Sequence, residues 1–347
     1  MRLRARTAAP PIATSSRRPR AGNSRGFGLL ATLDQQTQAF RDDVLAGLAA
    51  PVPAVPARWL YDRRGSELFD EITRLPSYYP TRTEVGIFHA IMPEVAELVP
   101  RGAAVVEFGA GSATKTPILL EAIAPAAYVP VDISGDYLEE SADELRQRFP
   151  SLDVIPVVAD FARPFSLPGG IEHLPKLGFF PGSTIGNFVP RSATDLLRQF
   201  RELLGDGAHL LIGMDRVKPV ERLIAAYDDP QGVTAQFTLN LLTRINHELG
   251  GDIPVEAFRH EARWNDILSR IEIHLVAMRD VEFTIAGTAF RFAAGSSIHA
   301  ENSHKYGSRG GRVLLLAGGW TPVAEWTDPA RDFAVILAEA QPKRFAP

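Results

Sequence analysis

The chain has 347 residues, of which 45% are hydrophobic and none is cysteine, and its formal net charge is −4. This length and hydrophobic content are typical of a globular protein with a substantial core, and they exclude disorder throughout. The lack of cysteine excludes disulfides, thiolate metal sites and a cysteine nucleophile, so the chemistry depends on oxygen and nitrogen groups.

The first segment in chain order, residues 1–33, is basic and rich in Pro and Ser. Its arginines all precede the first acidic residue, Asp34: Arg2, Arg4, Arg6, Arg17, Arg18, Arg20 and Arg25. This composition predicts a disordered tail. An organelle transit peptide is also Arg-rich and acid-poor, but the apolar residues here do not lie on one helical face. Because no signal-peptide pattern and no apolar run of roughly 18 residues is present, we expect a cytoplasmic protein that does not cross a membrane.

The body of the chain is acidic. The net charge of −4 becomes −11 when the seven arginines of the tail are set aside. A nucleic-acid partner requires a basic face, so this charge indicates a small-molecule substrate and no nucleic-acid partner. We expect the protein to be a monomer.

From residue 103 onward, short apolar runs alternate with helical patterns. Strands are predicted over 103–108, 127–132, 153–160, 176–182 and 208–215, and these runs are nearly continuous in apolar residues, as parallel strands covered on both faces are. Helices are predicted over 134–149 and 192–205, with Ser134 as a cap and Gly205 as a stop. The alternation predicts a doubly wound α/β sheet.

After Asp215 the pattern changes to a helical tract, roughly 219–250, and then to antiparallel strands over 270–280 and 281–292. A helix over 311–319 and two strands end the chain. The predicted fold is therefore α/β, with a doubly wound, mostly parallel, seven-stranded Rossmann-like sheet and an inserted α+β domain. The cofactor-binding domain is predicted over 81–216 and 305–347, and the substrate-binding domain over 34–80 and 217–304.

The loop after the first strand, VVEFGAGSATKT (105–116), is compatible with three cofactors. A P-loop and a dinucleotide fingerprint each require a glycine where this loop has Thr114, so both interpretations are weak. A methyltransferase loop expects a strand that ends in an acid, here Glu107, followed by Gly109 and Gly111, where the backbone approaches S-adenosyl-L-methionine.

Acidic residues also end the next two predicted strands. Asp132 could accept hydrogen bonds from ribose hydroxyls, although an NAD site would need the same acid. Asp160 and Phe161 stand where methyltransferases hold the adenine amine and cover the adenine ring. Each acid alone could be a helix cap or a solvated strand end, but three acids at consecutive strand ends of one sheet edge predict a site.

Longer strings make the prediction specific. They are YDRRGSELFDEITRLPSYYPTRTE (61–84), VEFGAGSATKT (106–116), YVPVDIS (128–134), GFFPGSTIGNF (178–188), AYDD (226–229), FRHEARWN (258–265) and IHAENSHKY (298–306). From about residue 35 to the end, the chain closely resembles the histidine-specific Nα-methyltransferases of ergothioneine biosynthesis. The resemblance implies S-adenosyl-L-methionine-dependent trimethylation of the α-amino group of L-histidine, which gives hercynine.

The resemblance also implies residue roles. Gly109, Lys115, Asp132, Asp160 and Phe161 would hold the cofactor; Tyr79, Asn187 and Tyr227 would bind the amino-acid end of the substrate; Glu301 and Ser303 would bind the imidazole, with Tyr61 near the ring. An acceptor and an adaptable hydroxyl suit the two imidazole nitrogens, and residues two apart in an extended segment point to one side. Methyl transfer depends mainly on positioning. Tyr79 and Asn187 are the candidate catalytic residues, and Tyr79 is hypothesised to steer the lone pair of the amine.

Three positions depart from the family pattern near the imidazole site: Ile273, Ala300 and His304. An Nα-methyltransferase for a different amino acid therefore remains an alternative, as does a cofactor-binding protein without turnover. An NAD-dependent oxidoreductase lacks a candidate proton relay near the loop. The string HEARW (260–264) begins like a zinc motif but has Trp264 in the place of the second histidine, so no metal is predicted.

Overall fold

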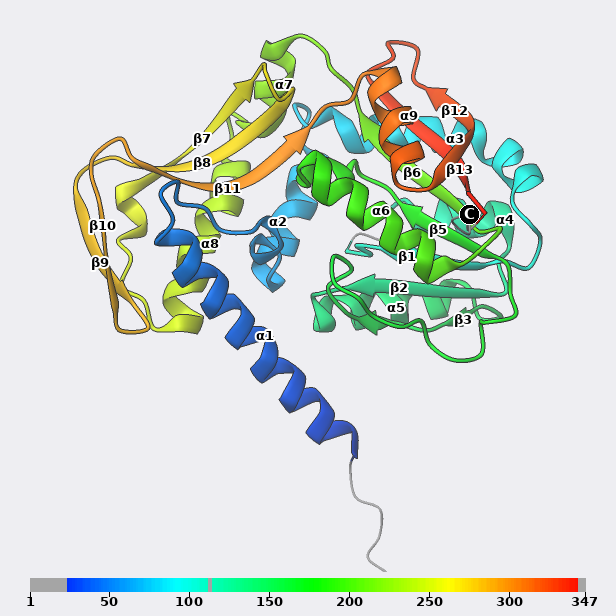
Figure 1. Cartoon of the computed structure of the whole chain (residues 1–347), viewed down its shortest axis with the longest axis horizontal. Helices are drawn as coiled ribbons and strands as arrows, with labels where there is room; N and C mark the ends of the chain where they lie inside the picture. The colour runs from blue at the N-terminus through cyan, green and yellow to red at the C-terminus, as the bar shows by residue number, and fades with distance from the viewer. Residues whose placement is uncertain (1–23, 112–113, 343–347) are drawn as a thin grey trace, which may run out of the picture. The chain divides into compact units, whose positions relative to one another are not determined.

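The computed structural model describes residues 24–111 and 114–342, with side chains described from residue 36 onward (Figure 1). Most of the predicted basic tail, residues 1–23, lies outside the described residues. Helix α1 (Ser24–Leu48) begins within the predicted tail, ahead of the expected boundary at residue 33. The run of Leu, Ala and Gln over residues 29–38 has high helix propensity, which accounts for the difference.

The central sheet has eight strands in the described part of the chain, in the order β12-β13-β6-β5-β1-β2-β3, with β4 also paired to β2. Their bounds are β1 Ala104–Phe108, β2 Ala127–Asp132, β3 Asp153–Val154, β4 Val157–Val158, β5 Lys176–Phe180, β6 His209–Asp215, β12 Trp320–Thr327 and β13 Phe333–Ala340. The pairs β12–β13 and β13–β6 are antiparallel, and the others are parallel. The predicted α/β class is confirmed. The predicted strand over 153–160 is two short strands, because Pro156 between them has no N–H to donate.

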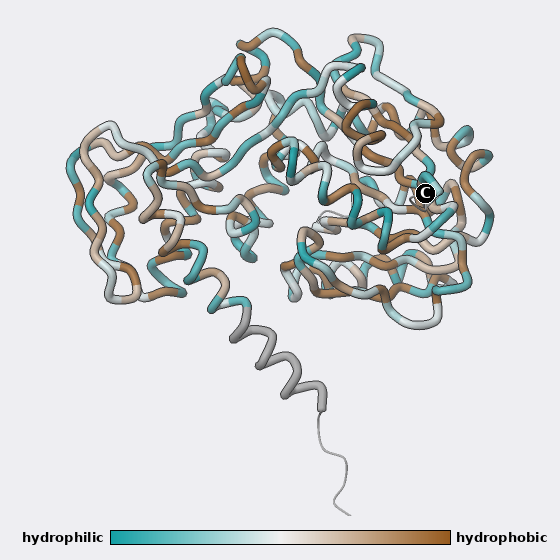
Figure 2. The backbone as a smooth tube through the Cα atoms, viewed as in Figure 1, coloured by the Kyte–Doolittle hydropathy of each residue, from teal (hydrophilic) through white to brown (hydrophobic). Residues whose placement is uncertain are grey.

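Helices cover both faces of this sheet (Figure 1). They are α3 Tyr79–Leu98, α4 Thr116–Ile123, α5 Gly135–Arg148, α6 Pro190–Leu204 and α9 Ser308–Ala317. Alternate strand residues enter two separate cores: Val105 packs with residues of α3, α4 and α5, whereas Val106 packs with residues of α6 and α9. Strands β1, β2, β5, β6 and β13 are therefore apolar and buried over most of their length (Figure 2).

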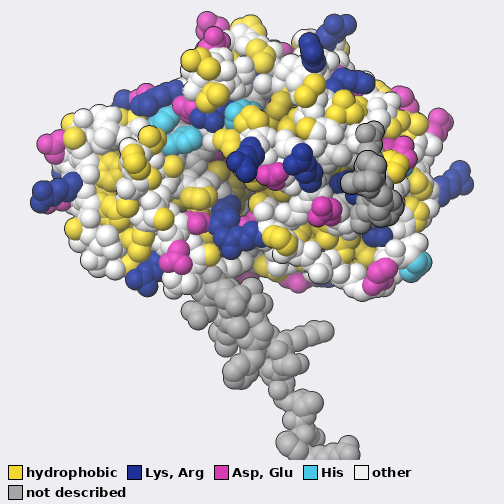
Figure 3. Space-filling view, in the orientation of Figure 1, with side chains coloured by type: hydrophobic (Ala, Val, Ile, Leu, Met, Phe, Trp, Pro, Cys, Tyr) yellow, Lys and Arg dark blue, Asp and Glu magenta, His cyan; other side chains and the backbone are white. Residues whose placement is uncertain are grey.

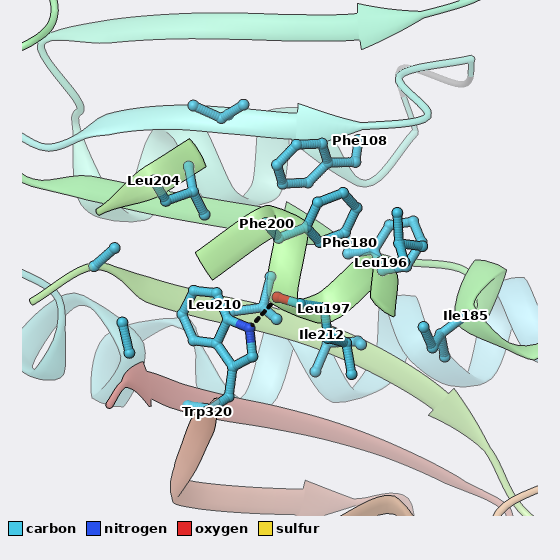
Figure 4. Packing of buried hydrophobic residues seen from close by; sticks show 14 of the residues in the cluster. Phe108, Phe180, Ile185, Leu196, Leu197, Phe200, Leu204, Leu210, Ile212 and Trp320 are labelled. Carbon is cyan, nitrogen blue, oxygen red and sulfur yellow. Dashed lines mark hydrogen bonds between the residues drawn. The ribbon is translucent and has the colours of Figure 1, made fainter. Parts of the chain in front are cut away.

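The core beside α6 and α9 is closely packed. The ring of Phe108 stacks on Phe200, with 3.7 Å between centroids. Trp320 is fully buried, and its indole Nε1 donates to the carbonyl oxygen of Leu197 over 2.8 Å (Figure 4). Because a buried indole needs a hydrogen-bond partner, this contact fixes the position of α6 against β12.

Residues 217–304 form an insertion of helices and antiparallel strands between β6 and α9. It contains α7 Val220–Tyr227, α8 Val233–Leu249, the 3-10 turn η3 Val255–Ala257, and strands β7 Phe258–Asn265, β8 Arg270–Ala277, β9 Val281–Ile285, β10 Thr288–Phe292 and β11 Ser297–His304. Strands β11-β8-β7 form an antiparallel sheet, and β9 and β10 form a hairpin. Helix α2 (Arg63–Arg74) packs on α8, and the 3-10 turn η1 (Ala57–Leu60) contacts α8 and β11.

Turn η1 and helix α2, which precede β1, therefore lie against the insertion that follows β6. Helix α3, however, packs on α4 and β13 of the central sheet. Residues 41–347 form one compact unit, so the division into two domains stays a prediction. No helix in the described ranges is both long and apolar enough to cross a membrane. On the face shown in Figure 3, basic and acidic side chains are interspersed.

The strand order places a candidate site. Strands β1 and β5 are neighbours, and the order of connections reverses between them. In open α/β sheets, ligands bind beyond the carboxyl ends of the strands at such a reversal. The 3-10 turn η2 (Thr184–Asn187) follows β5 at this edge and contacts β11.

Candidate active site

A cavity of about 580 Å³ lies beyond the carboxyl ends of β1 and β2. All the residues predicted to bind the cofactor line this cavity: Gly109, Gly111, Lys115, Asp132, Asp160 and Phe161. Its remaining wall includes Asp43, Arg58 and Tyr61 from the segment before α2, Phe69 of α2, Asn187 of η2 and Glu301 of β11. The large cavity thus joins the edge of the central sheet to the insertion.

The glycine loop is held against the end of β2. The backbone N–H groups of Gly109 and Ala110 both donate to the carbonyl oxygen of Val131, over 2.8 and 3.2 Å. Gly109 has φ +81°, a conformation that favours glycine, and a Cβ there would lie 3.4 Å from Cε1 of Phe161. The loop therefore needs Gly109 for its own shape and for close approach to the ring of Phe161.

Glu107 and Asp132 end neighbouring strands, but they have different surroundings. Oε2 of Glu107 accepts hydrogen bonds from Thr116 Oγ1 and the Tyr128 hydroxyl, each over 2.7 Å. Burial raises the pKa of Glu107 to about 7. Oδ1 of Asp132 accepts from the Ser134 backbone N–H over 2.8 Å, and burial raises the pKa of Asp132 to about 6. Donation from ligand hydroxyls would favour the charged form of Asp132 and offset this desolvation.

Asp160 is ion-paired in a way that the sequence did not predict. Its Oδ2 accepts from Arg58 Nη1 over 2.8 Å, and its Oδ1 accepts from the Ala162 backbone N–H over 3.0 Å. Arg58 belongs to η1 and also donates from Nη2 to Asp43 over 2.5 Å. A carboxylate has about four acceptor positions, so Asp160 can still accept a hydrogen bond from an amine.

Lys115 is positioned by a buried carboxylate from α3. Its Nζ lies 2.6 Å from Oε2 of Glu84, whose side chain is fully buried. Both carboxylate oxygens of Glu84 accept from the Gly182 backbone N–H, over 3.0 and 2.9 Å. A Cβ at position 213 would lie 2.0 Å from Glu84 Oε1, so the glycine in β6 makes room for this acid. Glu84 was not singled out in the sequence.

A small pocket of about 50 Å³ adjoins the large cavity. Residues that line both are Tyr61, Phe69, Tyr78, Gly182, Thr184, Asn187 and Glu301; Tyr227 and Ser303 line the small pocket. Five of the six predicted substrate residues, from four distant segments, therefore line this pocket, and Tyr79 is the exception. The aromatic ring of Tyr61 packs edge-on against Phe69 and Phe237.

Tyr79 does not lie where the sequence placed it. It is 1% exposed, is absent from the described lining of both hollows, and donates from its hydroxyl to Asp215 Oδ2 over 2.7 Å. Tyr78 lines both hollows, and its ring packs edge-on to Tyr227. Tyr79 is the first residue of α3, whereas Tyr78 is its N-cap and has non-helical backbone angles (φ −81°, ψ 80°), so the two side chains have different surroundings. The geometry therefore favours Tyr78 over Tyr79 as a residue that can contact a ligand.

Beneath the small pocket lies a buried polar group of residues, here named the Asp215 cluster: Asp215, Lys218, Lys305 and Tyr79. Asp215 Oδ1 lies 2.5 Å from Lys218 Nζ, and Oδ2 lies 2.8 Å from Lys305 Nζ. The two lysines hold the pKa of Asp215 below its usual range despite burial. Sequence reasoning missed this cluster, although Asp215 ends β6 at the same sheet edge as the predicted acids.

Tyr227 and Ser303 are joined to this cluster. The Tyr227 hydroxyl and Ser303 Oγ lie 2.7 Å apart, and Lys305 Nζ donates to both, over 2.8 and 2.7 Å. Tyr227 was predicted to bind the amino-acid end of the substrate, but its hydroxyl is held beside Ser303. The carbonyl oxygen of Tyr227 lies 2.8 Å from Nε2 of His260, which also bonds Thr238. His260 of the HEARW string thus has a structural role, and the described residues contain no group that could hold a metal ion.

Glu301 and Ser303 face the same pocket from alternate positions of β11. Burial raises the pKa of Glu301 to about 7, while the charge of Lys305 opposes this rise. A register irregularity between His299 and Glu301 precedes them. Turn η2 approaches this strand closely, since a Cβ at Gly186 would lie 2.9 Å from the carbonyl oxygen of His304. This close approach brings Asn187 to the wall shared with Glu301.

The three positions that depart from the family pattern differ in whether their residues line a cavity. Ile273 pairs with Glu301 in the sheet and is 1% exposed, but it is not among the described lining residues. Ala300 lines the large cavity. His304 is buried, and its backbone packs against Gly186. Ala300 is therefore the departure with direct access to a ligand.

Comparison with known proteins agrees with this geometry. Residues 40–340 match the family of histidine-specific, SAM-dependent methyltransferases. The chain is 38% identical over 313 residues to histidine N-alpha-methyltransferase of Mycolicibacterium smegmatis, which covers 88% of this chain and 96% of that protein. It is 39% identical over 307 residues to the protein of the same name from Mycobacterium tuberculosis, covering 86% of this chain and 94% of that protein.

A further relative is Ergothioneine biosynthesis protein 1 of Neurospora crassa, at 29% identity over 282 residues, which covers 79% of this chain and 32% of that protein. The extent of the family match and the identity to the mycobacterial proteins show the family. The chain belongs to the histidine-specific methyltransferases and is an S-adenosylmethionine-dependent enzyme.

Proposed function

We propose that this enzyme trimethylates the α-amino group of L-histidine to give hercynine, a step of ergothioneine biosynthesis. The observation that carries the proposal is the small pocket, where the Glu301 carboxylate and the Ser303 hydroxyl face one space beside the large cavity. The names of the relatives support the same substrate and pathway.

The chemistry of these two groups suits an imidazole. A neutral imidazole has one N–H, which a carboxylate accepts, and one nitrogen lone pair, to which a hydroxyl donates. A site built to hydrogen-bond a polar ring rejects an apolar ring by a factor of about 10⁴ to 10⁵ when buried groups would be left unpaired. Ser303 is buried and Glu301 is partly buried, so an apolar ring would leave both groups unpaired in this pocket.

Tyr78, Thr184 and Asn187 line both hollows and are therefore proposed to hold the amino-acid end of histidine. An amide, a hydroxyl and a phenol can orient a carboxylate and an amine without taking a proton permanently. Asn187 and Tyr78 would align the lone pair of the amine with the methyl donor. Alignment of this kind can supply roughly 7 to 11 kcal/mol of the barrier.

The residues of the large cavity fit S-adenosyl-L-methionine. Asp132 is a partly buried acceptor suited to two ribose hydroxyls, Asp160 is suited to the adenine amine, and Phe161 to the face of the ring. When bound, S-adenosyl-L-methionine supplies a methyl group on a sulfonium, which is transferred to the neutral amine. If the amine has a pKa two units above ambient pH, its deprotonation costs about 2.7 kcal/mol, so a strong base from the chain is unnecessary.

The experiment is calorimetric titration with L-histidine, alanine, tryptophan and α-N,N-dimethylhistidine, with and without S-adenosylhomocysteine. We expect selective binding of histidine and its dimethyl form, and mass spectrometry with S-adenosylmethionine should show three added methyl groups. Binding of S-adenosylhomocysteine without any histidine derivative would leave the family intact and disprove the substrate. An Nα-methyltransferase for another amino acid would then be favoured, with Ala300 the first position to test.

We also propose that the enzyme acts as a cytoplasmic monomer on this small molecule, without a nucleic-acid partner. The acidic body of the chain supports the last point. Sedimentation of the purified enzyme across a range of concentrations tests the oligomeric state, and a concentration-dependent dimer would contradict the proposal.

A further inference from the structure

Lys305 is a buried lysine whose hydrogen bonds are all committed. Its side chain is 0% exposed, and its Nζ donates to Asp215 Oδ2, Tyr227 Oη and Ser303 Oγ, over 2.8, 2.8 and 2.7 Å. An ammonium group has three hydrogens and no acceptor, so each of them is used. Two of the three point at hydroxyls on the wall of the small pocket.

These contacts limit what Ser303 can offer to a ligand. A serine hydroxyl has one hydrogen and two lone pairs, and Lys305 occupies one lone pair of Ser303. The Tyr227 hydroxyl lies 2.7 Å from the same oxygen. A phenol is the more acidic of the two hydroxyls, so it is the better donor, and its hydrogen then fills the second lone pair of Ser303. The hydrogen of Ser303 remains to point into the pocket.

The charges around Lys305 favour the same arrangement. The titratable or polar groups that interact with it are Asp215, Lys218, Tyr227, Ser303, Glu301 and His304. Tyr79 donates to the Asp215 carboxylate that Lys305 also contacts. Asp215 compensates one of the two lysines, which leaves one positive charge beside the negative charge of Glu301. A neutral ring therefore completes the charge balance of the pocket, whereas an imidazolium would add a positive charge close to Lys305.

We propose that Lys305 is a specificity-determining positioning residue that makes Ser303 a hydrogen-bond donor. The pocket then binds the imidazole of histidine in one neutral tautomer. The N–H of this tautomer points toward Glu301, and its nitrogen lone pair points toward Ser303. The inference rests on the proposed function and deepens it. Lys305 acts through Ser303 and Tyr227 and does not contact the reacting atoms.

The test compares L-histidine with 2-fluorohistidine, whose electron-withdrawing fluorine keeps the ring neutral, in enzyme saturated with S-adenosylhomocysteine from about pH 5.5 to about pH 8. The measured quantity is the dissociation constant of histidine divided by that of 2-fluorohistidine. The titration of Glu301 affects both constants equally, so it cancels in this ratio. In the wild-type enzyme this ratio should rise about tenfold per pH unit below the imidazole pKa of about 6.5. A flat ratio would overturn the inference without any variant.

Variants separate the contact from the charge. In Lys305→Met, Ser303 Oγ regains a lone pair for an imidazolium N–H, so the ratio should change by less than about threefold over the same range. At pH 8 the dissociation constant of histidine should be at least about tenfold higher in Lys305→Met than in the wild type, because the Ser303 hydroxyl is no longer fixed as a donor. Lys218→Met is the matched control: it removes a buried lysine from the same Asp215 carboxylate but does not contact Ser303, so it should keep the wild-type slope.

A double variant completes the test. Lys305→Met with Ser303→Ala should bind histidine within about threefold of the weaker single variant, since both changes remove the same donated hydrogen. Additive losses, or the wild-type slope in Lys305→Met, would overturn the role of Lys305. Failure of the wild-type enzyme to bind either ring while it binds S-adenosylhomocysteine would instead disprove the proposed function.

Discussion

The cofactor half and the substrate half of the site differ in how their charged groups are held. Around the large cavity, Asp132 is bonded by the N–H of Ser134, two residues on, and Glu107 by side chains of the following helix and the next strand. Around the small pocket, Tyr79 reaches Asp215 across 136 positions in sequence, and Tyr227 meets Ser303 across 76. In the first half Arg58 also reaches Asp160 across 102 positions, but the acids near the ends of β1 and β2 are held by the sheet and its connections. The second half forms only once the insertion has packed on the central sheet.

Substitution of Asp215 tests this difference, and it has the largest effect that we expect. Asp215→Ala would leave Lys218 and Lys305, which are 2% and 0% exposed, without their counter-charge. We expect the free energy of unfolding to fall by about 3 to 5 kcal/mol and histidine binding to be lost. Denaturant titration and calorimetry measure the two effects. The exposed pair Asp195–Arg198 supplies the control, because Asp195→Ala should leave stability nearly unchanged. Equal stability of the two variants would contradict a buried ionic cluster.

The next largest expected effect is on the pH dependence of the free energy of unfolding. It compares the cofactor half and the substrate half through one carboxylate in each. Burial raises the pKa of Asp132 to about 6 and that of Glu301 to about 7, so the folded protein binds protons more tightly than the unfolded chain. The stability contribution of each group is then greatest below its unfolded pKa, near 4, and is lost as pH rises through the folded pKa. Above pH 7 each charged carboxylate therefore costs stability.

Asp132→Asn and Glu301→Gln should remove this cost. Near pH 8 the free energy of unfolding of each variant should exceed that of the wild type by up to about 3 kcal/mol. Near pH 4 the two free energies should be nearly equal. The ligands should separate the halves: Asp132→Asn weakens S-adenosylhomocysteine binding about tenfold or more, whereas Glu301→Gln weakens only histidine binding. Denaturant unfolding at several pH values provides the measurement. A pH-independent stability difference would show that the carboxylates are not desolvated.

Neighbouring tyrosines provide a smaller and more local comparison. Tyr78→Phe removes a hydroxyl from the wall of both hollows, and we expect kcat/KM for histidine to fall about tenfold or more. Tyr79→Phe removes a hydrogen bond to the buried Asp215 carboxylate, which should lower stability by about 1.5 kcal/mol or more while kcat/KM changes less than about threefold. Steady-state kinetics beside thermal unfolding separates the two. The reverse pattern would restore Tyr79 as the residue that steers the amine.

The same contrast explains what the sequence could predict. Asp132, Asp160 and the glycine loop directly follow apolar strands, so strand position alone predicted where they meet, and the structure places them on one cavity. The choice between Tyr78 and Tyr79 depends on the backbone conformation at the start of α3, which no local pattern specifies. The ion pair between Arg58 and Asp160 joins residues 102 positions apart, and the contacts of Lys305 depend on the packing of β11. Such contacts follow from tertiary packing, which periodicity does not encode.

The smallest expected effect concerns Ile273, which the sequence singled out as a departure near the imidazole. Its side chain is buried in β8, opposite Glu301, and does not belong to the described lining of either hollow. Ile273→Met keeps apolar volume, so stability should change by less than about 1.5 kcal/mol and the preference for histidine over tryptophan by less than about threefold. Ala300→Thr, on the cavity wall, is the comparison and should shift ligand affinity more, as calorimetry with both amino acids would measure. A tenfold change in Ile273→Met would mean that selectivity is set by the sheet behind Glu301 as well as by the groups that line the pocket.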